Sequence, residues 1–376
     1  MGSSEKARRR RSCIVWGVLA AAALAEIASR LITPFLSPPP GGDILQLYAP
    51  HPYRVYALVP HAQNAAGHIS VNSHGFRGPE IALRKPPDTV RIACLGDSTT
   101  FNDTATTDGR TYPAQLERML REHSAKAGGR PSRIEVINAG VNGYTSLEAL
   151  IYFETRLLDY QLDLAVFHLG LNDAVFMACF RDFASDYTHA RKVFEIPRPR
   201  LWEHSAFLSL LLPRGRSIAN PFRRSPSADA TALIVKDASR LRADEAEQRR
   251  CFRPERIAIF ERNMRNFVAV ARGQGVTPIL STIVCGPQAG FFADVIVLLN
   301  QNIRRTAASL SAPCVDLARE MPWTAEAFMD SAHPRDCPEG LERMGRVFAD
   351  FLIRQKIVEQ AAEGIGKQKS EARGRK

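Results

Sequence analysis

The chain reads Arg91-Ile92-Ala93-Cys94-Leu95-Gly96-Asp97-Ser98-Thr99-Thr100-Phe101 at the point that decides its fold. The apolar run that leads to Gly96 is typical of a buried strand in a parallel sheet. Gly96 tolerates backbone angles that other residues avoid, so the chain can turn sharply there. Ser98 is therefore expected just past the carboxyl end of a strand, the edge at which open α/β sheets bind ligands. Residues 112–120 follow with helical periodicity, which gives the order strand, serine loop, helix.

A serine in this position also caps many helices, so the serine alone does not identify a nucleophile. That interpretation requires catalytic partners from elsewhere in the chain. Polar residues follow two further predicted strands. Strand 134–138 leads to glycines at 140 and 143, which let backbone N–H groups approach a ligand closely. Strand 162–169 leads to Gly170-Leu171-Asn172-Asp173, where Asn172 offers a neutral amide suited to holding an oxyanion. Asn172 or Asp173 would equally serve as a helix cap.

A base follows the last short strand, predicted at 313–317, in the sequence Asp330-Ser331-Ala332-His333. Because the two residues lie within one turn, the Asp330 carboxylate can accept a hydrogen bond from one ring nitrogen of His333. The other ring nitrogen is then free to act as a base. The same spacing also occurs in surface turns. Together the strand ends supply a nucleophile in Ser98, a base in His333 and an orienting carboxylate in Asp330. The expected oxyanion donors are the backbone N–H groups of Ser98 and Gly143 and the side-chain amide of Asn172.

Alternating strands and helices fill most of the remaining chain. Helices are predicted at 146–160, 255–273, 291–310 and 339–358, with a further strand at 276–284. Residues 174–255 break this rhythm and are interpreted as an insertion whose fold the sequence does not predict. An insertion beside a catalytic edge can act as a lid.

Charge and cysteine usage exclude several classes of protein. The net charge is +11 over 376 residues, but residues 1–12 and 354–376 contribute +4 each, which leaves +3 for the middle. A nucleic-acid binder usually carries a basic face on its folded domain, so nucleic acid is not an expected partner. Seven scattered cysteines show no zinc spacing, and no metal site is predicted. The sequence leaves open the possibility of one disulfide bond between Cys314 and Cys337.

The N-terminus carries a membrane signal with two interpretations. Four arginines at 8–11 precede an apolar run at 13–25, and apolar residues resume at 31–36 after Glu26 and Arg30. Residues 13–36 would form an uncleaved anchor, or 13–25 would be the core of a signal peptide cleaved after residues 23–25. Because the apolar pattern continues past Arg30, the anchor is favoured. In both cases the arginines stay cytoplasmic and the rest is exported, periplasmic or otherwise extracytoplasmic.

The predicted organisation has four parts. Residues 1–37 form the basic N-terminus and anchor, and 38–87 a linker and lead-in with a turn at 72–80. Residues 88–358 form the catalytic domain with its insertion at 174–255. Residues 359–376 form a disordered basic tail.

The four blocks Gly96-Asp97-Ser98, Gly143, Gly170 to Asp173 and Asp330 to His333 resemble, in order, the defining blocks of the SGNH (GDSL-type) hydrolases. The resemblance covers roughly residues 88–355, with the insertion as the main departure. It implies a flavodoxin-like α/β/α sandwich with a five-stranded parallel sheet. It also implies a serine esterase that needs no metal or cofactor and works through an acyl-enzyme on Ser98. The ester would be a small molecule, a lipid or an acylated carbohydrate.

Other interpretations share some of these features. The anchor and the turn at 72–80 resemble membrane-attached bacterial members of the family. An O-acyltransferase that acts on a cell-surface polysaccharide would use the same residues as an esterase. A non-catalytic binding domain is disfavoured because Ser98, Asn172, Asp330 and His333 are all present. A nucleotide-binding protein is disfavoured because no Gly-x-Gly-x-x-Gly or Walker pattern follows the first strand.

Overall fold

The structure is a computed structural model that describes residues 2–32, 47–64, 67–128, 131, 133–192, 205, 207, 234–242 and 244–364. The chain divides into two units, residues 1–42 with 196–224 and residues 43–195 with 225–376. Most of the predicted tail and the middle of the predicted insertion lie outside the described residues, but residues 359–364 are helical and not disordered as predicted.

A five-stranded parallel sheet forms the centre of the larger unit. Its strands lie in the order β4-β3-β5-β6-β7, and every neighbouring pair is parallel. The bounds are β3 (Thr89–Gly96), β4 (Arg133–Gly140), β5 (Leu164–His168), β6 (Thr277–Ser281) and β7 (Cys314–Val315). From β3 the chain first adds β4 on one side and then β5 on the other, so the topological switch point lies beside β3. The predicted fold class is confirmed.

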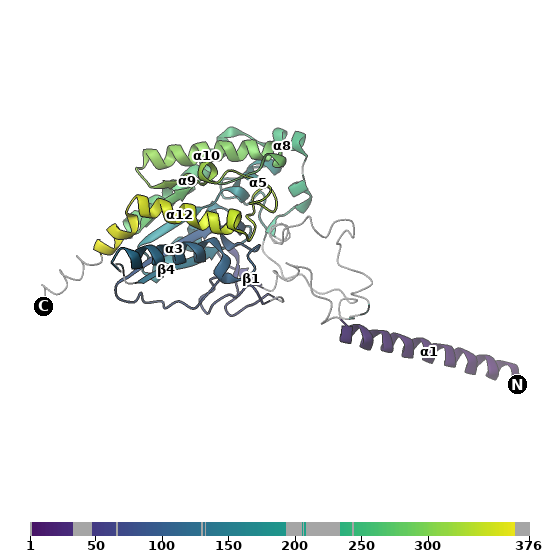
Figure 1. The fold of residues 1–376 in the computed structure, drawn as a ribbon. Coiled ribbons are helices and arrows are strands. Elements are labelled where there is room, and N and C mark those ends of the chain that lie inside the picture. Colours follow the sequence, from purple (N-terminus) through teal and green to yellow (C-terminus); the bar gives the residue numbers. More distant parts are fainter. Residues whose placement is uncertain are drawn as a thin grey trace. The chain divides into compact units, whose positions relative to one another are not determined.

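Helices cover both faces of this sheet, which makes three layers (Figure 1). Helices α3 (Tyr112–Lys126) and α12 (Arg343–Arg354) pack on the face that carries Ile92 and Cys94 of β3. Helices α4 (Ser146–Thr155), α9 (Ile257–Gly273) and α10 (Phe291–Ser309) pack on the opposite face with Ala93 and Leu95. Successive side chains of a strand point to opposite faces, so the unbroken apolar run of β3 is explained by burial on both sides.

Shorter elements complete the unit. They are α2 (Ser98–Phe101), α5 (Leu171–Cys179), α8 (Glu245–Cys251), α11 (Leu317–Glu320), η3 (Asp108–Arg110), η4 (Leu157–Tyr160), η6 (Ala238–Arg242), η7 (Pro254–Arg256), η8 (Pro287–Ala289) and η9 (Pro338–Glu342). The helix predicted over 146–160 is divided, because α4 ends at Thr155 and η4 follows. The last strand is only two residues long.

The lead-in segment, residues 47–87, packs against the sheet and helices of the larger unit. It begins with an antiparallel hairpin of β1 (Tyr48–His51) and β2 (Val55–Leu58). Its Arg77 pairs with Asn138 at the outer edge of β4. The Arg77 guanidinium donates to Phe101 O at 2.9 Å and to Asn102 O at 2.6 Å, and its Nε lies 2.8 Å from Asp108. The lead-in segment therefore holds the carboxyl end of α2.

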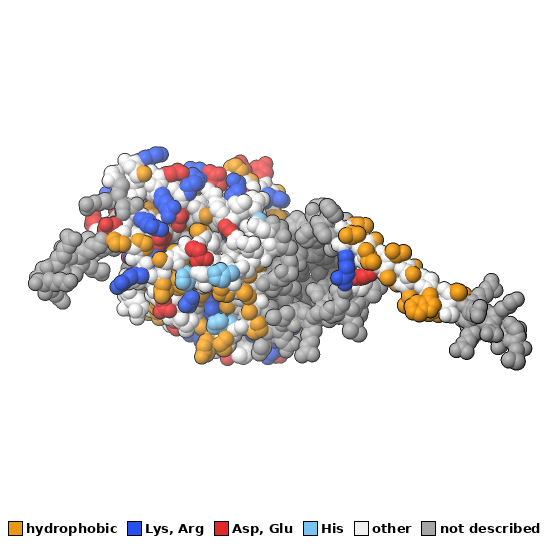
Figure 2. Space-filling model, turned by 90° about the horizontal axis from the view of Figure 1, so that it is seen from below, with side chains coloured by type: hydrophobic (Ala, Val, Ile, Leu, Met, Phe, Trp, Pro, Cys, Tyr) orange, Lys and Arg blue, Asp and Glu red, His pale blue; other side chains and the backbone are white. Residues whose placement is uncertain are grey.

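Helix α1 (Gly2–Ile32) belongs to the smaller unit. Its residues Ser12–Ile32 have a mean hydropathy of 1.8 and are long and apolar enough to cross a membrane, a test that signal sequences also pass. Figure 2 shows apolar side chains along this helix, interrupted by charged ones near one end. The expected pair of Glu26 and Arg30 is present at 2.8 Å.

All seven cysteines of the chain are free thiols. The open alternative of a bridge between Cys314 and Cys337 is therefore not realised.

Candidate active site

Ser98 lies where the sequence places it, in the first turn after β3. Asp97 caps the short helix α2 by accepting from the N–H of Thr99 at 2.8 Å. Ser98 is the first residue of α2 and is only 4% exposed. A side chain at Gly96 would approach His168 O to 2.8 Å and collide with Thr100. The glycine is therefore required for the close approach of β3, β5 and α2.

His333 and Asp330 reach Ser98 from the loop between α11 and η9. The Nε2 atom of His333 is 2.8 Å from the Ser98 hydroxyl, and its Nδ1 is 2.8 Å from Asp330 Oδ2. The N–H groups of Ala332 and His333 each donate to Asp330 Oδ1 at 2.8 Å. The turn thus fixes the carboxylate, which in turn orients the ring so that one nitrogen faces the serine.

Hydrogen bonds also join this loop to the segment after α2. The hydroxyl of Thr104 donates to Pro334 O at 2.6 Å. The N–H of Thr106 donates to Asp336 Oδ2 at 2.8 Å. The loop of His333 and the segment that follows the helix of Ser98 are therefore also held together outside the site, although 235 residues separate Ser98 from His333.

The charges around His333 favour its protonated form. Burial alone would lower the pKa of His333, but the hydrogen bond and charge of Asp330 outweigh it and raise that pKa to about 9. The charges of Asp103 and Asp97 act in the same direction. Burial would raise the pKa of Asp330, yet its hydrogen bonds with His333 and with backbone N–H groups lower it to about 2. This pair is built to stabilise an imidazolium.

Among the described residues, two backbone N–H groups of the expected site have no protein acceptor. Within the described part of the chain, neither the N–H of Ser98 nor that of Gly143 donates to another group, although both residues are buried. Buried N–H groups are rarely left unpaired, so these two are suited to a ligand. Gly143 has a φ of +78°, which favours glycine.

Asn172 also lies at this edge of the sheet, at the start of α5. Its amide nitrogen donates to Tyr144 O at 3.0 Å and lies 3.4 Å from Asp97 Oδ2. The second distance is longer than an ordinary hydrogen bond, so one N–H of this amide is only weakly held. All the residues expected at the site are thus brought to one edge, with Asn172 already bonded to the loop of Gly143.

Asp173, the residue after Asn172, serves the fold. It accepts from the N–H of Ser146 at 2.9 Å and from the hydroxyl of Tyr187 at 2.7 Å. Burial raises its pKa to about 6. Its carboxylate thereby holds the start of α4. The alternative in which Asn172 or Asp173 caps the following helix is wrong, because α5 has Gly170 at its N-cap and no side-chain cap.

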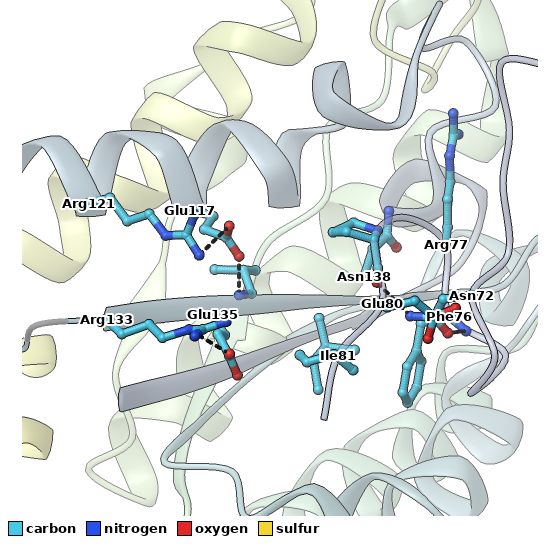
Figure 3. Close-up of a pocket in the computed structure, with 13 residues that line it drawn as sticks. Asn72, Phe76, Arg77, Glu80, Ile81, Glu117, Arg121, Arg133, Glu135 and Asn138 are labelled. Carbon is cyan, nitrogen blue, oxygen red and sulfur yellow. Dashed lines mark hydrogen bonds and ion pairs between the residues drawn. The ribbon is translucent and has the colours of Figure 1, made fainter. Parts of the chain in front are cut away.

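A cavity of about 220 Å³ lies away from Ser98, at the outer edge of β4 (Figure 3). Four of its charged lining residues form two ion pairs, with Arg121 3.0 Å from Glu117 and Arg133 2.9 Å from Glu135. Glu117 also accepts from the N–H of Val136 at 2.6 Å. These side chains cover the free edge of the sheet, and the lining does not include Ser98, Asp330 or His333. Among the described residues, no cluster of three or more His, Cys, Asp or Glu could hold a metal ion.

Comparison with known proteins identifies the family. The sequence model of the GDSL-like Lipase/Acylhydrolase family matches residues 94–336. No curated protein matches the chain. A lipase/acylhydrolase from Enterococcus faecalis is 16% identical, with a TM-score of 0.40 and coverage of 70% of this chain and 95% of its own. A catalytic mutant of Axe2, an acetylxylan esterase from Geobacillus stearothermophilus, is 13% identical, with a TM-score of 0.41 and coverage of 72% and 94%.

The two solved structures are too distant to indicate a substrate, so the assignment rests on the match over residues 94–336, which is more than half of the chain. The chain belongs to the GDSL-like lipase/acylhydrolase family, and it is an ester-hydrolysing enzyme.

Proposed function

We propose that the enzyme cleaves carboxylic esters through an acyl-enzyme on Ser98. The observation that carries this proposal is the continuous series of hydrogen bonds from Ser98 Oγ through His333 to Asp330, each 2.8 Å long. The Ser98 oxygen attacks the ester carbonyl while its proton passes to Nε2 of His333. The imidazolium then gives this proton to the departing alcohol. Water repeats the sequence on the acyl-enzyme and releases the carboxylic acid.

Asp330 supports this sequence without leaving its carboxylate form. Its low pKa keeps it charged over the working pH range, so it stabilises the positive ring that forms when His333 takes the serine proton. The acidic groups Asp97 and Asp103 add to the same field. The attack therefore creates a charge that the site already favours.

The oxyanion of the tetrahedral intermediate would lie between the N–H groups of Ser98 and Gly143. Both donors come from buried residues and have no acceptor among the described groups. The amide of Asn172 would turn its weakly held N–H from Asp97 to the oxyanion and keep its bond to Tyr144. Donors fixed in advance stabilise this charge without reorganisation.

The cellular location of the enzyme is inferred from helix α1. We infer that Ser12–Ile32 anchors the enzyme in a membrane and that the basic residues before it remain cytoplasmic. The catalytic unit is then extracytoplasmic, and its substrates are esters that occur there: small molecules, lipids or acylated carbohydrates.

The test is hydrolysis of p-nitrophenyl acetate, butyrate and octanoate by the full chain in detergent. Ser98→Ala should abolish the activity, and Ser309→Ala, on the exposed face of α10, should leave it unchanged. A mass increase of one acyl group on the wild type, absent from Ser98→Ala, would reveal the intermediate. Equal hydrolysis by the wild type and Ser98→Ala would refute the proposal.

A further inference from the structure

The loop that carries Gly143 is held by its carbonyl groups. Three consecutive carbonyl oxygens each accept from a side chain of a different segment. Asn142 O accepts from the hydroxyl of Tyr56, Gly143 O from Nη2 of Arg191 at 3.1 Å, and Tyr144 O from the amide of Asn172 at 3.0 Å. Asn172 belongs to the family blocks, whereas Tyr56 and Arg191 come from the lead-in segment and the insertion.

Peptide geometry gives the Tyr56 contact a direct consequence for Gly143. The carbonyl of Asn142 and the N–H of Gly143 belong to one planar trans peptide, so they point in opposite directions. When Tyr56 fixes the carbonyl, it also fixes the direction in which the N–H points. A carbonyl that accepts a hydrogen bond polarises its own peptide and makes the N–H a stronger donor.

Tyr56 is well held for this role. Its side chain is 1% exposed, and burial raises the pKa of Tyr56 well above its usual value, so the hydroxyl keeps its proton. The hydroxyl of Tyr144 donates back to Tyr56 O at 2.5 Å. The two rings also meet edge to face, with centroids 5.4 Å apart. The hairpin and the loop are therefore joined in both directions.

Arg191 fixes the next peptide of the loop. Its side chain is 8% exposed and forms a bidentate ion pair with Glu148, with distances of 2.7 and 2.6 Å. Glu148 also accepts from the N–H of Thr145 at 2.8 Å as part of a capping box that starts α4. Because Arg191 is held by Glu148, its bond to Gly143 O anchors the loop to the start of this helix.

We propose that Tyr56 and Arg191 are positioning residues for the oxyanion donor of this esterase. They set the planes of the peptides on both sides of Gly143, and Tyr56 polarises the N–H that meets the oxyanion. This inference rests on the proposed function. Tyr56 lies outside residues 94–336, the part that matches the family, so part of the catalytic precision of this chain comes from its lead-in segment.

The experiment compares wild type, Tyr56→Phe and Tyr160→Phe as full chains. Tyr160 is also fully buried, and within the described residues its hydroxyl has no hydrogen-bond partner, so Tyr160→Phe controls for the loss of a buried hydroxyl. Tyr56→Phe should lower kcat about tenfold, the value of one hydrogen bond of about 1.4 kcal/mol, with KM within about twofold. The pH profile should keep its midpoint, because His333 is not altered.

A boronic acid provides a second readout because its serine adduct is a tetrahedral anion like the intermediate. Tyr56→Phe should weaken a boronic acid inhibitor by the same factor as kcat/KM, while acetate, the carboxylate product, should bind with unchanged affinity. Arg191→Lys should act in the same direction, since lysine keeps the charge beside Glu148 but loses the bidentate geometry.

Three results would overturn the inference: unchanged kcat and boronate affinity in Tyr56→Phe, equal weakening of boronate and acetate, or the same loss in Tyr160→Phe. They are distinct from failure of the proposed function, which would show as wild-type activity that does not depend on Ser98.

Discussion

At the scale of single residues, the proposed mechanism makes Asp330 the group that sets the pH at which His333 would act as a base. A base must be unprotonated, and the pKa of His333 is raised to about 9. The kcat/KM for an ester should therefore rise with pH and level off only above about pH 9. The hydrogen bond and the negative charge of the Asp330 carboxylate raise the pKa of His333. Asp330→Asn removes both effects. The rising limb should then move to lower pH while the maximum rate falls.

The measurement is kcat/KM from pH 5 to 10 in wild type and Asp330→Asn. A second variant, Asp186→Asn, removes an exposed carboxylate that caps its own turn and should leave the midpoint in place. A rising limb that stays at the wild-type pH in Asp330→Asn would show that another group controls the profile.

Asn172 offers a second test at this scale. Loss of one oxyanion donor costs about 3–4 kcal/mol of transition-state stabilisation, so Asn172→Ala should slow turnover a hundredfold or more. The lost bond to Tyr144 should cost only about 1 kcal/mol of folding free energy. Turnover and denaturant unfolding of the same preparation separate the two effects. Wild-type turnover in this variant would remove Asn172 from the site.

At the scale of elements, glycines allow α2 to lie against the sheet. A Cβ at Gly140, the last residue of β4, would lie 2.6 Å from the carbonyl carbon of Thr100 and 2.7 Å from the Cα of Phe101. Both atoms are backbone and cannot rotate away, so Gly140→Ala should displace the helix that begins with Ser98. We expect a stability loss of about 1–3 kcal/mol and a marked fall in kcat.

Gly273 provides the matched control. It ends α9, and nothing lies within 4 Å of a Cβ placed there. Gly273→Ala should be neutral or stabilise the protein by up to about 1 kcal/mol. Thermal melting and ester hydrolysis of both variants test this contrast, and a Gly140→Ala protein with wild-type melting and turnover would contradict it.

The sequence predicted the sheet and the candidate site because both depend on local patterns. Each strand is an apolar run, and a polar loop follows its end, as at Gly96 and Gly170. Periodicity also placed most helices within a few residues, although it extended the helix after residue 146 to residue 160, beyond the end of α4 at Thr155. Local patterns cannot show which distant side chain will bond to a loop carbonyl. Tyr56 and Arg191 occur in stretches without motif or period, so their roles emerge only from the folded chain.

At the scale of the whole molecule, the lead-in segment is part of the hydrophobic core of the larger unit. Its buried apolar side chains join the same hydrophobic cluster as β3, α4 and α9, and they are Leu47, Tyr48, Tyr56, Leu58, Ile69, Val71 and Phe76. Strands of four residues with many prolines and histidines around them gave little sequence signal. The sequence therefore indicated a linker and a lead-in with short strands, and the structure adds that residues 47–87 contribute side chains to the core.

This arrangement predicts where the enzyme can be shortened. A fragment of residues 43–376 keeps the lead-in segment and should melt cooperatively. A fragment of residues 88–376 loses seven buried apolar side chains, each worth about 1.5–3 kcal/mol when buried. Even after allowance for the chain entropy regained, this loss is comparable to the 5–15 kcal/mol by which a typical domain is stable.

The shorter fragment also loses Arg77 and with it the bonds to Phe101 O and Asn102 O that hold the end of α2. It should therefore bind a hydrophobic dye, lack a sharp melting transition and be inactive, even though it contains Ser98, Asn172, Asp330 and His333. Calorimetry and ester hydrolysis of the two fragments decide the matter. If the fragment of residues 88–376 has the same melting transition and the same rate of ester hydrolysis as the fragment of residues 43–376, the lead-in segment does not contribute to the stability of the core.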